Sequence, residues 1–131
     1  MKKLLIIMLI LTFVMVGCSV GTGKENAKDT GYKKISAEEA KKIMDSEEII
    51  VLDVRTLEEY SSAHIENAVL LPVTEIATKA EEVLPDKDAK ILVYCRSGNR
   101  SATAARELIN MGYTNVYDFG GINSWPYEVV K

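Results

Sequence analysis

The heptapeptide CRSGNRS begins at Cys95, directly after the apolar stretch ILVY and before an alanine-rich stretch with helical spacing. A cysteine is a strong nucleophile only as its thiolate, which nearby cations and helix N-termini favour. Arg96 and Arg100 flank the cysteine, and a helix that starts near Asn99 or Ser101 would direct its positive end at the sulfur. The stretch therefore predicts a reactive thiolate in a loop between a strand and a helix, rather than a cysteine buried for packing.

The same loop has the composition of an anion-binding cradle. Gly98 can adopt a positive φ, which would turn successive backbone N–H groups toward one point. Ser97, Asn99 and Ser101 add side-chain donors, and Asn99 or Ser101 could cap the following helix. Arginines at a helix N-terminus oppose the helix dipole, so their presence there indicates an anion to be bound. We expect the loop to stabilise an anion such as a sulfur atom carried on Cys95 as a persulfide.

A second group of charged residues follows another apolar run, IIVLDV, over residues 49–54. Unbroken apolar runs are typical of strands buried on both faces of a parallel sheet. Ligands bind at the carboxyl edge of such sheets, where Asp53 and Arg55 would meet the cysteine loop if the two strands are neighbours. We expect Asp53 to be structural, pairing with the loop or capping local N–H groups, and Arg55 to form a salt bridge with Glu59. A structural hydrogen-bonding role is favoured for His64.

The stretches around these residues alternate between strand and helix patterns. Strands are predicted over residues 32–36, 49–54, 68–73, 89–95 and 115–121, and helices over 37–46, within 55–63, over 73–84 and over 101–113. Ser36 and Glu39 form a capping-box signature, and Gly112 is expected to end the last helix. This alternation predicts an α/β fold with a mainly parallel sheet.

Length, charge and composition exclude several functional classes. The chain has 131 residues and a formal net charge of -3, which suits one globular domain and lacks the basic stripe of a nucleic-acid binder. One histidine and two distant cysteines make a zinc site improbable. We therefore expect no metal, no organic cofactor and no nucleic-acid partner.

The N-terminus has the pattern of an export signal. Two lysines precede the apolar stretch LLIIMLILTFVMVG, which is shorter than the roughly 18 residues of a membrane-spanning helix. The sequence MVGC ending at Cys18 resembles the bacterial lipoprotein signal, which implies cleavage before Cys18 and its lipidation. We expect a signal peptide over 1–17, a polar, glycine-containing tether over 18–31 and a folded domain over 32–131. An uncleaved anchor helix is the alternative, and either arrangement places the domain outside the cytoplasm, held at the cell membrane.

Taken in order, the motifs of the domain resemble the rhodanese family of sulfurtransferases over residues 34–127. They are DVR at 53–55, EY at 59–60, HI at 64–65, CRSGNR at 95–100 and GGINSW at 120–125. The resemblance implies a three-layer α/β/α fold around a five-stranded sheet. It also implies that Cys95 takes up a sulfane sulfur as a persulfide, within a pocket formed by residues 96–101, and passes it to a thiophilic acceptor. Relatives have GHIPGA where this chain has AHIENA, so the turn at 63–68 departs from the family pattern.

The sequence also narrows the partners and the alternative functions. Outside Cys18 the chain has no second cysteine, so a persulfide on Cys95 must be resolved by an external thiol, by cyanide or by a protein thiol. Tyrosine phosphatases and some arsenate reductases have a Cys-x5-Arg loop, whereas the spacing from Cys95 to Arg100 is Cys-x4-Arg. A smaller ring of donors suits sulfur better than phosphate. A binding or sensory module with the same fold, and less favourably a phosphatase or arsenate reductase, are the alternatives to a sulfurtransferase acting on thiosulfate-like or persulfide donors.

Overall fold

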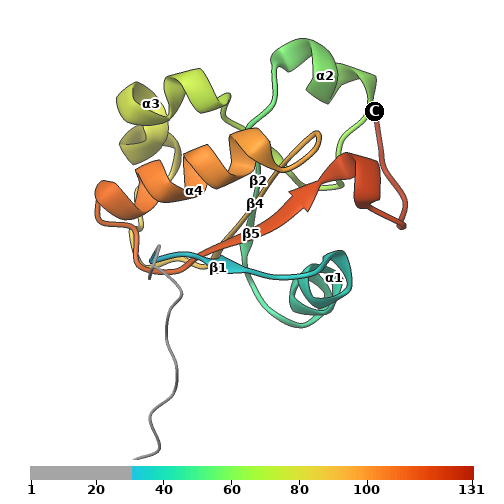
Figure 1. Cartoon of the computed structure of the whole chain (residues 1–131), viewed down its shortest axis with the longest axis horizontal. Coiled ribbons are helices and arrows are strands. Elements are labelled where there is room, and N and C mark those ends of the chain that lie inside the picture. Colours follow the sequence, from blue (N-terminus) through green and yellow to red (C-terminus); the bar gives the residue numbers. More distant parts are fainter. Residues whose placement is uncertain (1–30) are drawn as a thin grey trace, which may run out of the picture.

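The computed structural model describes residues 31–131, which form helices and strands in alternation (Figure 1). The predictions for Cys18, for the signal peptide over 1–17 and for all but the last residue of the tether lie outside the described residues. Within the described part, no helix has the length and hydropathy that crossing a membrane requires.

The elements in chain order are β1 (Lys33–Lys34), α1 (Ala37–Ser46), β2 (Ile50–Asp53), α2 (Leu57–Ser62), β3 (Val69–Leu70), the 3-10 turn η1 (Val73–Glu75), α3 (Ile76–Val83), β4 (Ile91–Cys95), α4 (Asn99–Asn110), β5 (Val116–Gly121) and the 3-10 turn η2 (Ile122–Ser124).

The five strands form one sheet in the order β1-β5-β4-β2-β3, and every neighbouring pair is parallel. The predicted α/β class with a five-stranded sheet is confirmed. The sheet was expected to be mainly parallel, and all of its strand pairs are parallel. Strands β2 and β4 are hydrogen-bonded neighbours. The residues that follow these two strands therefore meet at one edge of the sheet, as expected from their place in the sequence.

Helices cover both faces of the sheet, which gives the three layers (Figure 1). Helices α3 and α4 lie on one face, and α1 lies on the other. Strand β4 is buried along its whole length, and its side chains alternate between the two faces. Val93 and Cys95 belong to the cluster under α3 and α4, whereas Leu92 and Tyr94 belong to the cluster on the side of α1.

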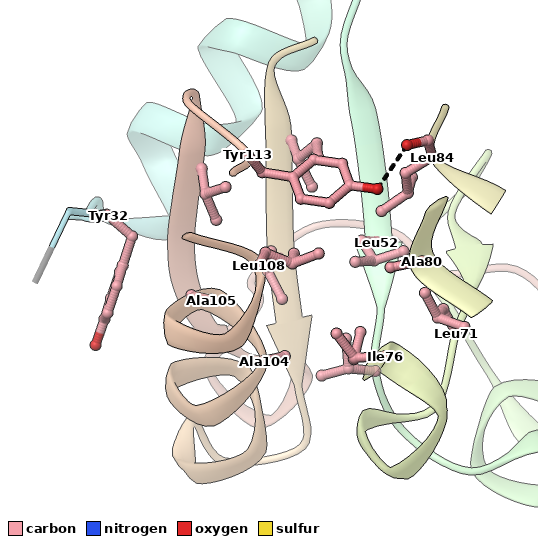
Figure 2. Close-up of a cluster of buried hydrophobic side chains, with 14 of the residues drawn as sticks. Tyr32, Leu52, Leu71, Ile76, Ala80, Leu84, Ala104, Ala105, Leu108 and Tyr113 are labelled. Carbon is pink, nitrogen blue, oxygen red and sulfur yellow. Dashed lines mark hydrogen bonds between the residues drawn. The ribbon is translucent and has the colours of Figure 1, made fainter. Parts of the chain in front are cut away.

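The larger of the two apolar clusters fixes α3 and α4 to the sheet (Figure 2). Leu52 of β2, Ile76 of α3 and Leu108 of α4 are fully buried there. Tyr113 lies at the edge of this cluster and donates a hydrogen bond from its hydroxyl to the carbonyl of Leu84, at 2.7 Å. This bond joins the chain segments that follow α3 and α4, so both helices are held in fixed positions against the sheet.

Local sequence explains where several helices begin and end. The Ser36 hydroxyl accepts a hydrogen bond from the Glu39 N–H, which caps α1 as predicted. Gly112, at φ +97°, follows Met111, the C-cap of α4, as a left-handed stop. Helix α4 begins at Asn99, and its N-cap is Gly98 without any side-chain cap. The prediction that Asn99 or Ser101 caps this helix is therefore wrong.

The turn that departs from the family pattern is closed by an asparagine. Asn67 has φ +65°, a conformation that asparagine tolerates better than other non-glycine residues. The N–H of Ala68 donates to the carbonyl of Ile65 at 3.0 Å across this turn. Asn67, at the position of the second glycine of GHIPGA, thus provides a left-handed turn residue, and β3 begins two residues later.

Candidate active site

Cys95 is the last residue of β4 and lies at the carboxyl edge of the sheet, where Figure 1 shows the loop that leads into α4. Its side chain is 1% exposed. The backbone N–H of Gly98 donates a hydrogen bond to Cys95 Sγ, with the nitrogen 3.0 Å from the sulfur. A backbone donor aimed at the sulfur stabilises negative charge on it. The loop therefore curls around the sulfur and provides it with a fixed dipole.

The curvature of the loop depends on two glycines from different segments. Gly98 has φ +107°, as the sequence predicted, so the loop turns sharply into the N-terminus of α4. Gly121 of β5 lies directly against the loop, because a Cβ atom there would overlap the carbonyl oxygen of Arg96. The buried Ser101 hydroxyl donates to the carbonyls of Gly98 and Gly120, at 3.0 and 3.3 Å. The end of strand β5 thus packs directly against the cysteine loop and fixes its position.

Arg100 points its guanidinium at the first turn of α2. Its Nη1 and Nη2 donate to the two carboxylate oxygens of Glu59 at 2.6 and 2.9 Å. These hydrogen bonds lower the pKa of Glu59 to about 2 and raise the pKa of Arg100. The anion that accompanies Arg100 at the helix N-terminus is therefore a carboxylate of the chain itself. A role for Arg100 in binding a substrate anion stays a prediction.

Glu59 is itself held in place by a capping box. The Thr56 hydroxyl accepts from the Glu59 N–H at 3.2 Å, and the Glu59 carboxylate accepts from the Thr56 N–H at 3.4 Å. The predicted salt bridge between Arg55 and Glu59 is therefore wrong. The signal that could have corrected it is the Thr-x-x-Glu spacing at 56–59, which places the Glu59 carboxylate at the start of α2.

Arg55 instead forms a buried ion pair with Asp53. Arg55 Nη2 lies 2.7 Å from Asp53 Oδ2, and the two side chains are 5% and 0% exposed. The same guanidinium donates to the carbonyl of Ala63 at 2.7 Å, and the Tyr94 hydroxyl donates to Asp53 Oδ2 at 2.7 Å. Burial and the hydrogen bond to Asp53 raise the pKa of Tyr94. The Ile65 N–H donates to the Tyr94 hydroxyl.

The structural role predicted for Asp53 agrees with this network. With both carboxylate oxygens occupied by Arg55 and Tyr94, Asp53 has no free position from which to accept a substrate proton. The network ties the end of β2 to the segment between α2 and β3. Tyr94 was not identified from the sequence, because an apolar strand pattern does not show that one member carries a buried hydroxyl.

The loop separates two cavities. Arg96 is exposed and lines a cavity of about 570 Å³, whose wall also includes Arg55, Glu59, Trp125 and Tyr127. On the opposite side of the loop is a cavity of about 300 Å³ that includes Ser97, Gly98, Asn99, Lys34 and Asp118. Of the predicted site residues, Arg96 lines one cavity and residues 97–99 line the other. Arg100 lines neither of them, and Ser101 is buried behind the loop.

His64 and Trp125 hold the chain near the larger cavity. His64 Nδ1 lies 2.8 Å from the carbonyl oxygen of Tyr60, and the two rings stack at 3.7 Å. The His64 backbone also forms an antiparallel bridge with Val130. These contacts agree with the structural role expected for His64. Trp125 is 9% exposed and packs against Phe119, so it fills a core position. No three His, Cys, Asp or Glu side chains within residues 31–131 gather as metal ligands.

The fold and the site together define an α/β domain with an all-parallel sheet, in which a loop at the carboxyl edge holds a cysteine. The comparisons with known proteins then specify the family. Residues 36–127 match the Rhodanese-like domain, and the chain belongs to this family.

Individual relatives agree with the family match. The chain is 42% identical over 87 residues to adenylyltransferase and sulfurtransferase UBA4 of Candida albicans, covering 61% of this chain and 20% of that protein. It is 35% identical over 95 residues to thiosulfate sulfurtransferase GlpE of Coxiella burnetii, covering 72% of this chain and 87% of that protein. The crystal structure of a rhodanese-related protein from Thermoplasma volcanium is similar with a TM-score of 0.67 and 35% identity, covering 76% of this chain and 98% of that one. The family and these names support a rhodanese-type sulfurtransferase in general terms.

Proposed function

We propose that this protein is a sulfurtransferase in which Cys95 carries a sulfane sulfur from a donor to a thiol acceptor. The observation that carries the proposal is the N–H of Gly98, which lies 3.0 Å from the sulfur of the only described cysteine at the N-terminus of α4. A donor aimed at the sulfur stabilises the thiolate before the reaction, and again when the thiolate leaves in the second step. The names of the relatives at 35–42% identity support the same chemistry.

The proposed reaction has two steps. The Cys95 thiolate attacks the outer sulfur of a donor such as thiosulfate. A Cys95 S–S bond forms while the S–S bond of the donor breaks, and sulfite leaves with the electron pair. The acceptor thiolate then attacks the outer sulfur of the persulfide, and the Cys95 thiolate leaves as the new S–S bond forms on the acceptor. In this proposal the N–H groups in the first turn of α4, which lack intrahelical acceptors, stabilise the terminal sulfur of the persulfide.

A persulfide would also make the buried Cys95 accessible to an acceptor. Cys95 is 1% exposed, and an S–S bond of about 2 Å moves the reactive atom outward from that position. The acceptor would therefore meet the outer sulfur and not the sulfur of the cysteine itself. No second thiol lies within residues 31–131, so the acceptor must come from outside this domain.

Mass spectrometry of the intact chain after treatment with thiosulfate tests the proposal. We expect an adduct of about 32 Da, which is one sulfur atom, that cyanide removes and that Cys95→Ser does not form. A chain that takes up no sulfur from thiosulfate or from an organic persulfide would instead support a binding module. Release of phosphate from an aryl phosphate would support the phosphatase alternative.

We further propose that the protein acts outside the cytoplasm, attached to the cell membrane by a lipid on Cys18. The support is the sequence pattern alone, with lysines, a short apolar stretch and a cysteine in order. Detergent phase partitioning of the wild type against Cys18→Ala tests it. We expect the wild type in the detergent phase and the variant in the aqueous phase or retained as an unprocessed precursor, and equal aqueous partitioning of both would contradict the proposal.

A further inference from the structure

The cavity of about 570 Å³ beside the cysteine loop is larger than an inorganic sulfur donor requires. Cavities of this size hold organic ligands, whereas thiosulfate is small and has no apolar surface. The cavity begins one residue from the nucleophile, because Arg96 is the residue after Cys95 and lines it. Glu59, which binds Arg100 of the same loop, lines it as well.

Three charged side chains lie around this cavity, and only one of them has an uncompensated charge. Arg55 is paired with Asp53, and Glu59 is paired with Arg100. Arg96 is exposed and has no ion-pair partner within residues 31–131. The backbone position of Arg96 is nevertheless fixed, since its carbonyl accepts a hydrogen bond from the N–H of Asn123 at 3.1 Å. The cavity therefore presents one available positive charge at a defined place.

The C-terminal wall of the cavity is apolar and partly open to solvent. Tyr127 is 36% exposed and Val129 is 43% exposed, and both line this cavity together with Ile122 and Trp125. The rings of Trp125 and Tyr127 meet edge to face at 4.9 Å. Exposed apolar side chains grouped at a concave site mark a place where a ligand covers them.

Building on the proposed sulfurtransferase function, we propose that the sulfur acceptor is a small organic thiol with an apolar body and an anionic group. The anionic group lies against Arg96, and the apolar body lies on Tyr127 and Val129. The thiolate then attacks the outer sulfur of the Cys95 persulfide, and the product leaves as an organic persulfide. The same pocket would hold that persulfide as a donor in the reverse direction, because the reaction passes through the same contacts.

Single-turnover transfer from the purified full-length chain tests this proposal. Cys95 is loaded with sulfur from thiosulfate, excess donor is removed, and the loss of about 32 Da is followed with each acceptor. The acceptors are 4-mercaptobenzoate, its uncharged amide 4-mercaptobenzamide, and 3-mercaptopropionate, which keeps the charge without the ring. Rates are counted per mole of thiolate and divided by the rate of the same thiolate with a small-molecule disulfide, so that differences in thiol acidity and in intrinsic nucleophilicity cancel. These normalised rates are the ones compared between acceptors.

We expect 4-mercaptobenzoate to react roughly fivefold faster than either of the other acceptors, as fits one partly solvated charge contact and one apolar contact. Arg96→Gln should remove the preference for the charged acceptor. Val129→Asn should reduce the preference for the aromatic acceptor. Two matched controls lie outside the cavity: Arg106→Gln exchanges another exposed arginine, and Val130→Asn exchanges a comparably exposed valine. Neither control should change either preference.

Equal rates for charged and uncharged acceptors, or a preference that persists in Arg96→Gln, would overturn the proposed acceptor class. Transfer to protein thiols alone would overturn it too and would favour a protein partner. These outcomes differ from a failure of the sulfurtransferase function itself. In that case no sulfur would be loaded on Cys95 in the first step, and the comparison between acceptors would not begin.

Discussion

Arg100 in the first turn of α4 donates two hydrogen bonds to the Glu59 carboxylate in the first turn of α2. The pair joins the cysteine loop to a helix that is 41 residues away in sequence. It also sets the charge beside the sulfur, because the charge of Arg100 is electrostatically coupled to Cys95. Removing either partner should therefore change both stability and reactivity, in directions that follow from the charges.

Glu59→Gln should destabilise the domain at neutral pH by about 1 kcal/mol, allowing for solvent screening of side chains that are 34% and 27% exposed. The pKa of Glu59 is lowered from 4.5 to about 2. Its contribution is complete above pH 4.5 and is lost as the pH falls toward 2. Urea unfolding of both proteins between neutral pH and about pH 2 should show the difference shrinking over that window. Glu58→Gln, in the same turn of α2, is the control, and a difference that is constant with pH would contradict the assignment.

The same pair should control the reactivity of Cys95 in opposite directions. Glu59→Gln leaves the positive charge of Arg100 uncompensated, so iodoacetamide should alkylate Cys95 faster than in the wild type at neutral pH. Arg100→Gln removes the cation, so alkylation and the uptake of sulfur should both slow. The rate of alkylation at a fixed neutral pH measures both effects. Equal rates in all three proteins would show that this pair has no electrostatic effect on Cys95.

Gly121→Ala should disrupt the active site far more than Gly120→Ala, although both glycines lie at the end of β5. A Cβ on Gly121 would overlap the carbonyl of Arg96 and force the cysteine loop to move. At Gly120, with φ +90°, a Cβ would meet no atom within 4 Å, so alanine there costs only backbone strain of about 1–2 kcal/mol. Sulfur loading from thiosulfate and thermal unfolding should be measured together. Equal sulfur loading in the two variants would show that the loop tolerates displacement.

Tyr94→Phe should destabilise the domain by about 1–3 kcal/mol. The variant removes one hydrogen bond from the buried carboxylate of Asp53 and leaves the N–H of Ile65 without its acceptor. Guanidinium unfolding at neutral pH measures the loss. Tyr117→Phe is the matched control on β5, because its hydroxyl has no hydrogen-bond partner within the described residues. A loss no greater than that of the control would show that solvent replaces the tyrosine hydroxyl.

The fold could be predicted from the sequence because strand and helix patterns are local. The apolar runs that end at Asp53 and Cys95 indicated two buried parallel strands, and these strands are neighbours. The loop conformation was also accessible, because Gly98 is the residue that can turn there at no steric cost. The charge partners were only partly accessible. The Thr-x-x-Glu spacing indicates that the Glu59 carboxylate belongs to a capping box at the start of α2. The pairing of Arg100 with Glu59 was not accessible, because it depends on how α2 packs beside the start of α4.

The loop was also predicted as a single pocket, whereas its residues face two cavities. Arg96 lines one cavity, whereas the three consecutive residues Ser97, Gly98 and Asn99 line the other. This division depends on where β5 supports the loop, and that contact involves Gly121, which is distant in sequence. The C-terminal residues Tyr127 and Val129 were not considered as site residues, because no local chemical pattern identifies them.

The alternation of side chains along β4 has a consequence for how this domain can diverge. The thiol of Cys95 faces the cluster below α3 and α4, whereas Tyr94, one residue earlier, anchors the Asp53 network on the opposite face. Loss of the thiol therefore leaves the network that fixes the carboxyl edge untouched. A descendant could lose its chemistry in one substitution and keep its shape, and recover that chemistry by the reverse substitution. The proposed nucleophile and a residue that stabilises the fold are thus neighbours on one strand, and either can change without changing the contacts of the other.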